Sequence, residues 1–311
     1  MNDPFHLVPQ RASSMAGAVD HVFFTVLGIT GVTALAVTAT IIVLCIRFRR
    51  GSRAERSPPP TRHRGLELAW TILPLLVFLG IFLWAAKVYS DFFRVPPDAI
   101  PIFVVARQWM WQAQHDNGRR EIDELHLALG QPVRLLMTSQ DVIHSFYVPA
   151  FRLKRDVVPG RYQTLWFTPT ELGEFYLLCA EYCGTEHARM RGRIIVLSPS
   201  EYARWLAASQ PAPGMAARGA ELYRQHGCSG CHDPPSTVHA PRLAGLYGRQ
   251  VHLQDGRTVV ADEAYLRDSI LQPGKEVVAG FASIMPSYQG QIGEDELLQL
   301  LAYLQSLKEA Q

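Results

Sequence analysis

The sequence of 311 residues is poor in cysteine and carries almost no net charge. Only five cysteines are present, and four of them form two close pairs, Cys179 with Cys183 and Cys228 with Cys231. Such spacing is typical of metal or cofactor attachment and argues against a small domain held together by a disulfide framework. Lys and Arg number 30 against 28 Asp and Glu, a net charge of +2. This balance does not indicate a nucleic-acid-binding protein.

The first 21 residues lack the basic start and the long apolar run of a secretory signal. We interpret residues 1–21 as a short exported tail. By contrast, residues 22–46 contain no charged side chain, and in residues 67–89 a stretch of 19 residues, 68–86, contains none. About 20 apolar residues cross the core of a bilayer as a helix. We therefore predict two transmembrane helices rather than two helices buried in a soluble core.

Arginine is concentrated between these two segments. Residues 47–66 hold seven arginines and a single acid before the second helix begins, Glu55. The positive-inside rule places such a loop in the cytoplasm. Both termini, and everything after the second helix, are then expected on the periplasmic or outer side of a bacterial inner membrane.

Two thiols, an imidazole and a thioether occur within twelve residues, between two strand-like runs. Sulfur ligands together with imidazole suit copper, and a weakly bound methionine is a usual companion. A second histidine lies upstream at the start of another strand-like run. Read alone, the loop could instead bind zinc or form a disulfide. The candidate ligands of a two-copper centre are His144, Cys179, the backbone carbonyl of Glu181, Cys183, His187 and Met190.

These residues resemble the signature of cytochrome c oxidase subunit II. That family has a Cys-x-Glu-x-Cys-Gly-x-x-His-x-x-Met loop and an upstream His-Ser-aromatic-x-x-Pro segment, matched here by residues 179–190 and 144–149. The resemblance implies a CuA centre in an all-β cupredoxin Greek-key domain, residues 95–199. It also implies a magnesium ion at the interface with subunit I, bound with help from the side chain of Glu181. From the residues alone, that side chain could equally be a solvated loop acid.

Short runs rich in Val, Leu, Phe, Tyr and Trp, separated by Gly, Pro and Asp, favour a β-sandwich between residues 101 and 198. Two tryptophans one residue apart, Trp109 and Trp111, are expected on the same face of a strand. Both could be core residues. The resemblance implies that Trp109 is where electrons from cytochrome c reach the domain.

Glu67 opens the second apolar segment, directly before Leu68 and a Trp-Thr-Ile-Leu-Pro run. An acid there can simply complement the dipole at a helix N-terminus. The resemblance implies a different role, at the mouth of the proton path called the K channel in subunit I. The residues themselves do not decide between the two roles.

A second cofactor motif follows a proline-rich linker. Residues 200–213 predict a short helix and this linker, and residues 214–311 a separate domain. Cys228 and Cys231 directly precede His232, which is the attachment signature of c-type haem. A thioredoxin-like motif or half of a zinc site is the alternative. Similarity to class I cytochromes c implies His232 and Met285 as the two iron ligands, with Met215 as the other methionine of the domain.

The predicted fold is a membrane-anchored multidomain chain: a two-helix transmembrane hairpin, an all-β cupredoxin domain and an all-α cytochrome c domain. This combination resembles the subunit II of caa3-type terminal oxidases. It implies electron transfer from an external cytochrome c or bc-type complex, through haem c and CuA, to haem a in subunit I, with subunit III as a further partner. The alternative is a membrane-anchored electron-transfer protein that serves a nitric oxide or nitrous oxide reductase.

Overall fold

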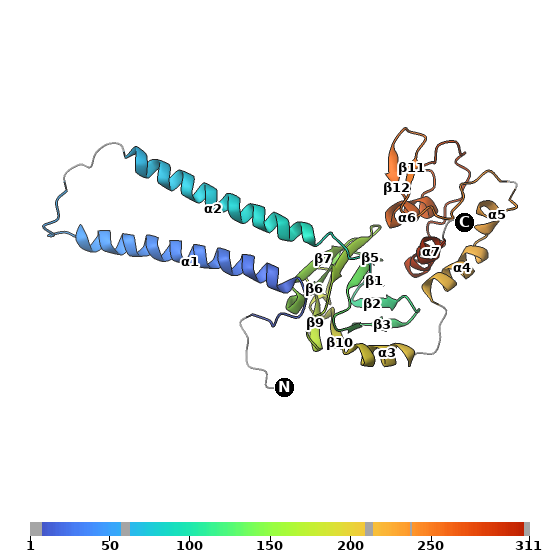
Figure 1. Cartoon of the computed structure of the whole chain (residues 1–311), viewed down its shortest axis with the longest axis horizontal. Helices are drawn as coiled ribbons and strands as arrows, with labels where there is room; N and C mark the ends of the chain where they lie inside the picture. The colour runs from blue at the N-terminus through green and yellow to red at the C-terminus, as the bar shows by residue number, and fades with distance from the viewer. Residues whose placement is uncertain (1–7, 57–62, 209–213, 237, 308–311) are drawn as a thin grey trace. The chain divides into compact units, whose positions relative to one another are not determined.

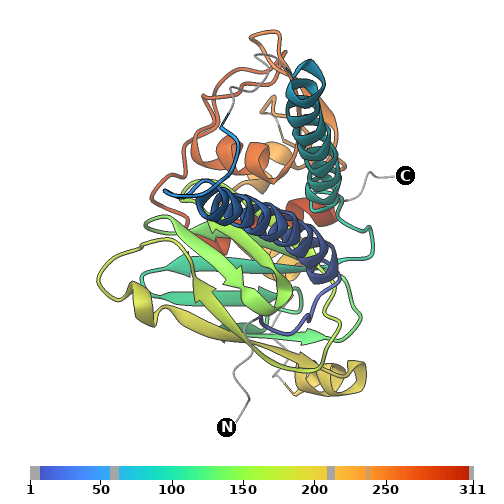
Figure 2. The same ribbon diagram turned by 90° about the vertical axis from the view of Figure 1, so that its left-hand side faces the viewer.

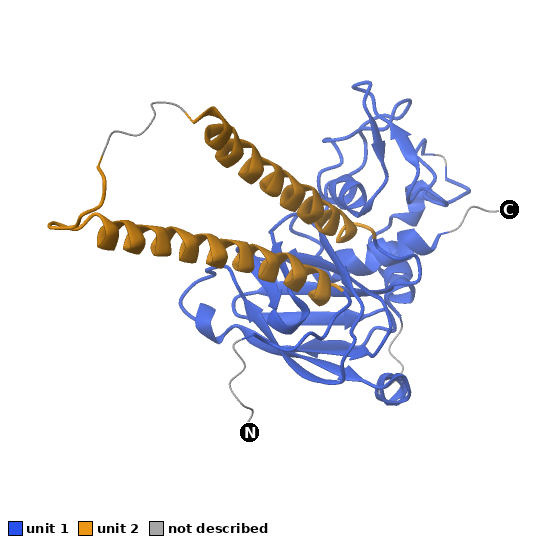
Figure 3. Ribbon diagram, turned by 60° about the vertical axis from the view of Figure 1, so that its left-hand side comes forward, with its two compact units in different colours: residues 1–14, 95–311 blue, residues 15–94 orange. Residues whose placement is uncertain are grey.

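The computed structural model of the chain describes residues 8–56, 63–208, 214–236 and 238–307. Parts of four predicted segments lie outside the described residues: the start of the N-terminal tail, the middle of the arginine-rich loop, the proline-rich linker, and residues 237 and 308–311 of the C-terminal domain. The chain divides into two compact units, residues 15–94 and residues 1–14 with 95–311 (Figure 3).

The smaller unit contains two long apolar helices, α1 (Ala16–Arg47) and α2 (Arg64–Asp91) (Figure 1). Their most apolar windows have mean hydropathies of 2.4 and 2.3, and none of those residues is buried within the structure. Helices that are apolar on every side and exposed in the isolated chain are typical of a membrane environment. Both helices extend beyond the predicted apolar segments because neighbouring polar residues continue the helical hydrogen bonding. Pro74 lies inside α2, which is tolerated in membrane helices.

Residues 95–208 form a two-layered β-sandwich, here called the sandwich domain (Figures 1 and 2). The first sheet contains, in spatial order, β3 (Arg120–Ile122), β2 (Met110–His115), β1 (Ile100–Arg107), β5 (Val133–Ser139) and β8 (Gln163–Phe167). The second contains β4 (Glu124–Ala128), β10 (Arg191–Leu197), β9 (Gly173–Cys179), β6 (His144–Val148) and β7 (Leu153–Val157).

Large side chains fill the space between the two sheets, among them Trp111, Phe146, Phe151 and Phe167, each no more than 2% exposed. The pairings β1 with β5 and β4 with β10 are parallel, and the other strand pairings are antiparallel. Both sheets place strands that are distant in sequence side by side, which is typical of Greek-key sandwiches, and the predicted all-β fold is confirmed.

Two short 3-10 helices lie in the connections of the sandwich, Pro149–Phe151 and His187–Arg189. The helix α3 (Pro199–Ala207) follows β10 and begins with a capping box between Ser198 and Glu201. The N-terminal tail also belongs to this domain, because Ala12 N–H donates to the carbonyl of Ala150 at 3.0 Å.

Residues 214–307, here called the helical domain, contain four helices and a small hairpin. The elements are α4 (Met215–Gln225), α5 (Ser229–His232), β11 (Gln250–His252), β12 (Thr258–Val260), α6 (Glu263–Leu271) and α7 (Glu294–Ser306). The strands β11 and β12 pair as an antiparallel hairpin, with Asp255 and Gly256 between them. The helices α4 and α7 cross so closely that a Cβ at Gly219 would lie 2.0 Å from the carbonyl oxygen of Gln299.

Candidate copper centre and haem-binding site

The sandwich domain brings all the predicted copper ligands together at one end of its second sheet. Cys179 ends β9, and His144 begins the neighbouring strand β6. Cys183, His187 and Met190 follow in the loop that leads to β10. Cys179 Sγ lies 3.8 Å from Cys183 Sγ, 3.9 Å from His144 Nδ1 and 3.2 Å from the carbonyl oxygen of Glu181. Cys183 Sγ lies 3.4 Å from His187 Nδ1 and 3.7 Å from Met190 Sδ.

The spacing of these donors fits metal sharing and does not fit a disulfide. The two sulfur atoms are far beyond the roughly 2.05 Å of a disulfide bond. Each sulfur has its own imidazole, and a thioether and a carbonyl complete a mixed donor set. Soft thiolates with imidazole favour copper over hard cations. The donors that the chain provides therefore fit a pair of copper ions bridged by Cys179 and Cys183.

The two thiols differ in acidity. Burial alone raises the pKa of Cys179, but hydrogen bonds with His144 and with the backbone of Ser145 and Glu181 outweigh it and lower the pKa to about 6. Burial, together with the adjacent charge of Cys179, raises the pKa of Cys183 to about 12. One thiolate is thus available near neutral pH, whereas the second needs a bound cation to release its proton.

Residues around the ligands hold them in orientation. Asp141 Oδ1 lies 2.8 Å from His144 Nε2, and the same carboxylate accepts from the backbone N–H groups of Gln108 and Val142. A carboxylate on the second nitrogen of a ligating histidine fixes its tautomer and ring orientation. The buried ring of Trp111 packs edge-on against His144, with 6.1 Å between centroids. Sequence reasoning missed Asp141, although its place three residues before His144 was a usable signal.

The structure corrects the expectation for the two tryptophans. The strand β2 begins only at Met110, and Trp109 lies in the turn after β1. Trp111 points into the core, whereas the indole Nε1 of Trp109 donates to the carbonyl of Cys183 at 3.2 Å. The side-chain amide of Gln108 donates to the same carbonyl at 2.8 Å. They do not share a strand face because the turn takes Trp109 out of the β1–β2 pairing and lays it on the copper loop.

Gly184 allows this contact. Its φ of +120° disfavours other residues, and a Cβ there would lie 2.9 Å from the Gln108 amide and 3.2 Å from the Trp109 ring.

The side chain of Glu181 is exposed on the same loop. Glu67 lies in the first turn of α2, where its carbonyl accepts from the Thr71 hydroxyl. Its position is compatible with both roles considered from the sequence.

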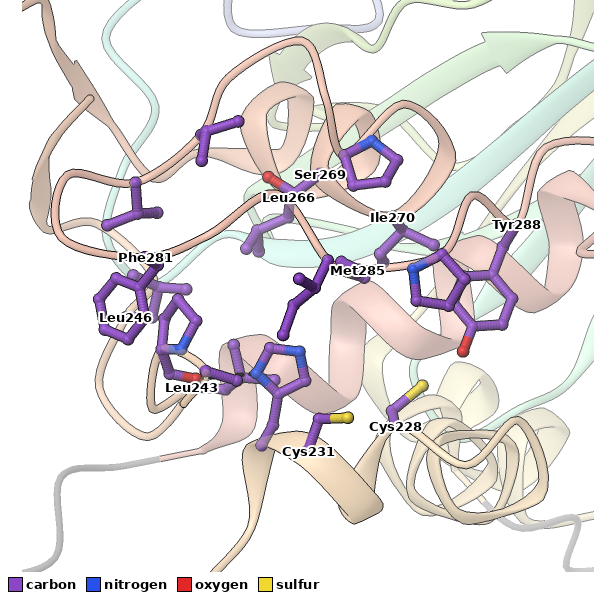
Figure 4. Close-up of a pocket in the computed structure, with 18 of the residues that line it drawn as sticks. Cys228, Cys231, Leu243, Leu246, Leu266, Ser269, Ile270, Phe281, Met285 and Tyr288 are labelled. Atoms are coloured by element: carbon purple, nitrogen blue, oxygen red, sulfur yellow. Dashed lines mark hydrogen bonds between the residues drawn. The ribbon is translucent and has the colours of Figure 1, made fainter. Parts of the chain in front are cut away.

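The helical domain encloses a cavity of about 330 Å³ (Figure 4). Cys228 and Cys231 lie along one side, and Met285 projects into the space that they border. His232 Nδ1 lies 2.8 Å from the carbonyl oxygen of Pro241, so the other ring nitrogen, Nε2, is the one that can bind iron. The remaining walls are mainly apolar and include Leu243, Leu246, Leu266, Ile270 and Phe281. An apolar slot with two thiols and two axial donors fits covalent haem c.

Met215 does not compete with Met285 for the iron. It is completely buried, but its neighbours are Phe103, Val105 and Leu136 of the sandwich domain and Leu298 of α7. The cavity lining contains Met285 and not Met215. Among the described residues of the helical domain, this leaves Met285 as the methionine that can face His232 across the cavity.

A buried polar cluster lies elsewhere in the sandwich domain and was not predicted. Glu121 Oε1 accepts from the backbone N–H of His126 and lies 2.7 Å from His115 Nε2, while Glu121 Oε2 contacts the ring of His126. The indole of Trp205, on α3, stacks on His126 with 4.4 Å between centroids. The Arg119 guanidinium covers the other side of that indole, 3.6 Å from its centroid. This cluster fastens α3 to the strands.

Comparison with known proteins agrees with both halves of this architecture. Residues 83–198 match the family described as "Cytochrome C oxidase subunit II, periplasmic domain", and residues 216–308 match "Cytochrome c". The cytochrome c oxidase subunit 2 of Alkalihalophilus pseudofirmus is 28% identical over 90% of this chain and 84% of its own length.

Two further relatives extend the comparison. The alternative cytochrome c oxidase subunit 2 of Bradyrhizobium diazoefficiens is 30% identical over 66% of this chain and 84% of its own length. The solved periplasmic domain of subunit II from Bradyrhizobium japonicum is 31% identical, covers 37% of this chain and 95% of that domain, and has a TM-score of 0.35. The protein thus belongs to the cytochrome c oxidase subunit 2 family and carries a cytochrome c domain after its cupredoxin-like domain.

Proposed function

We propose that this chain is the subunit through which electrons pass from a covalent haem c to a CuA centre and on to subunit I of a haem–copper oxidase. When bound, haem c and the copper pair supply one-electron redox chemistry. The observation that carries the proposal is the convergence of five donor side chains and one carbonyl, from the start of β6, the end of β9 and the loop after β9, each within 3.9 Å of a cysteine sulfur. Membership of the subunit 2 family supports the same function.

The protein residues have separate tasks in this scheme. Cys179, Cys183, His144, His187, Met190 and the Glu181 carbonyl would hold the copper pair. Asp141 holds the His144 ring in place. On the haem side, Cys228 and Cys231 form the thioethers, and His232 and Met285 bind the iron. A methionine opposite histidine raises the iron potential, as an electron carrier requires.

Trp109 is proposed as the residue by which electrons reach the copper loop. Its indole touches the backbone of Cys183, a bridging ligand, and is only half buried. This places an aromatic ring between the domain surface and a copper ligand. No acid–base or nucleophilic group is needed for this step, because it transfers only electrons and oxygen is reduced in a partner subunit.

Copper binding by the full-length, detergent-solubilised chain tests the proposal. We expect two copper ions per chain and a mixed-valence electron resonance signal, both lost in the variant Cys183→Ser. Cys45→Ser is the matched control, because Cys45 is an exposed thiol on α1 and should keep both. One zinc per chain with no resonance signal would refute the copper assignment.

Several finer assignments complete the proposal. The arginine-rich segment faces the cytoplasm, and both termini and both redox domains lie on the periplasmic side of a bacterial inner membrane. Subunits I and III are the partners in the bilayer, and a cytochrome c or a bc-type complex is the donor. Purification of the chain through a C-terminal tag identifies the partner. Haem a absorbance in the purified complex supports the oxidase. Co-purification with a nitric oxide or nitrous oxide reductase would support the alternative function instead.

Glu67 and Glu181 are given roles at the contact with subunit I. Glu67, in the first turn of α2, is proposed to lead protons into the oxidase, and the Glu181 side chain to help bind magnesium. Glu67→Gln should slow turnover of the assembled oxidase and leave copper and haem c content intact. Unchanged turnover would mean that Glu67 only complements the dipole at the N-terminus of α2. Glu181→Gln should lower the magnesium content but not the copper content, since only the carbonyl of Glu181 binds copper.

A further inference from the structure

The outer face of the first sheet is apolar and carries part of the helical domain. On β1, Ile102, Val104 and Ala106 face the sandwich core, whereas Phe103 and Val105 alternate with them on the outer face. Phe103 and Val105 are nevertheless only 2% and 3% exposed. They form one cluster with Leu136 of β5, Met215 of α4 and Leu298 and Ala302 of α7. A strand buried on both faces explains the unbroken apolar run that β1 shows in the sequence.

The helix α7 is apolar on two sides because it packs against two different surfaces. Leu300 and Leu304 line the haem cavity. Leu298 and Ala302 belong to the cluster on the outer face of the sheet. A helix with a single apolar stripe has one buried side, whereas α7 serves the interior of its own domain and the neighbouring domain at once.

Charged and polar pairs surround this apolar centre. Gln112 Nε2 donates to Asp295 Oδ2 at 3.0 Å, and Arg120 lies 3.6 Å from the same carboxylate. On β5, Arg134 Nη1 lies 3.2 Å from Glu263 Oε1. The sandwich domain supplies both cations and the helical domain supplies both acids. An apolar centre with a complementary polar rim is the usual anatomy of a lasting protein interface.

Both described ends of the linker are attached to the sandwich domain. Before the linker, Trp205 is held between His126 and Arg119. After it, the backbone N–H of Met215 donates to the carbonyl of Asp116 at 3.0 Å. The linker therefore joins two points of the same surface, and its length does not set the distance between the two domains.

We propose that the outer face of the β3-β2-β1-β5-β8 sheet is a permanent docking surface for the helical domain of the same chain. The two domains then act as one rigid body rather than as a carrier swinging on a tether. If they separated, Phe103, Val105, Leu136 and Leu298 would be exposed to water together, which is unfavourable. Transient redox partners meet through smaller, wetter contacts. The docking itself does not depend on the proposed function.

Cross-linking in the full chain, loaded with haem and copper, tests the docking. In the variant Arg134→Lys, a carbodiimide should couple the new amine to Glu263 and give one cross-linked peptide by mass spectrometry. Adding Glu263→Gln should abolish that peptide, which identifies the site. About twelve Gly and Ser residues inserted between Gln210 and Pro211 should change the yield by less than about twofold. For a domain that moves freely on its linker, the same insertion would lower the local concentration about fivefold.

Variants in the apolar centre provide the decisive comparison. Leu298→Arg should lower the cross-link yield at least tenfold and make the remaining yield depend on linker length. Val105→Arg disturbs the interface from the other domain and should do the same. Covalent haem and copper content show that each domain still folds. A yield that falls with linker length in the parent, or that survives both arginine variants in folded protein, overturns the proposal. Normal docking with no haem-to-copper transfer would instead count against the proposed electron route alone.

Discussion

The two cofactor sites of this chain are built in opposite ways. At the copper loop, the proposed protein donors already lie within 3.2–3.9 Å of the sulfur atoms of Cys179 and Cys183, and backbone and carboxylate hydrogen bonds fix their directions. In the helical domain, apolar side chains enclose about 330 Å³, and few polar atoms face inward. Hydrogen-bonded donors define the first site, whereas the shape of the cofactor defines the second. The copper site should therefore keep its form without metal, and the haem site should depend on its occupant.

Removing the haem attachment should have the largest effect and test this contrast directly. We expect Cys228→Ala with Cys231→Ala to prevent covalent attachment. Without haem, the apolar side chains that line the cavity lose their main packing partner, and such a loss is large against the roughly 5–15 kcal/mol that stabilises a small domain. Circular dichroism should show an unfolded helical domain beside a sandwich domain that still binds copper. A double variant in which the helical domain keeps its cooperative unfolding transition would contradict the contrast.

Trp109, whose indole lies on the copper loop, is the next residue to test. Trp109→Phe keeps an aromatic body but loses the hydrogen bond to the Cys183 carbonyl. If Trp109 carries the electron, flash-initiated transfer from haem to copper should slow on the order of 100-fold, about 2.7 kcal/mol of activation free energy. Copper-to-haem-a transfer should be unchanged. The matched control is Trp111→Phe, which alters the core packing against His144. Equal rates in Trp109→Phe and the parent chain would assign the electron path to another residue.

The pH dependence of stability tests the buried polar cluster that fastens α3 to the strands. Burial alone raises the pKa of Glu121, but hydrogen bonds from His115 and His126 outweigh it and hold the pKa below the ordinary 4.5. Ionised Glu121 therefore contributes to the free energy of unfolding above about pH 4.5, and this contribution is lost as the pH falls through the lowered pKa of the folded protein. Glu121→Gln should cost about 1–3 kcal/mol at neutral pH and remove this part of the acid dependence. Urea unfolding at a series of pH values measures both effects.

The control for that experiment lies three residues along the chain. Glu124 of β4 pairs with Arg193 of β10 on the surface of the second sheet, so Glu124→Gln should leave the stability nearly unchanged. Exposed ion pairs contribute little. If the two variants lost equal stability, the buried cluster would have no special part in fastening α3.

The smallest expected effect on folding comes from Met285→Ala. The thioethers still hold the haem, so the domain should stay folded with its full haem content. The sulfur-to-iron band at the red end of the spectrum should disappear, and the reduction potential should fall because the methionine ligand raises it. Met285→Leu keeps the apolar volume and should give the same spectrum with less loss of stability. An unchanged band in either variant would move the sixth ligand elsewhere.

Both cofactor sites could be predicted from the sequence because their donors are local or marked by neighbours. Cys228, Cys231 and His232 are contiguous, and four copper ligands lie within one loop. The position of Trp109 was predicted wrongly, because spacing alone does not reveal where a turn ends and a strand begins. The pairing of Glu121 with His115 and His126, and the second apolar face of α7, depend on contacts between elements. Such contacts are set by tertiary packing and leave no periodic signal in one sequence.

The close crossing at Gly219 has a consequence for how such a chain can arise. Because no side chain separates α4 from α7 there, the first and last helices of the helical domain lie against each other. Attachment of the domain to another protein then needs only one short peptide near a single spot, and its interior is undisturbed. A domain whose first and last helices pack on each other in this way can be appended to another protein as a unit. The close packing of α4 on α7 thus favours the spread of this domain as a module.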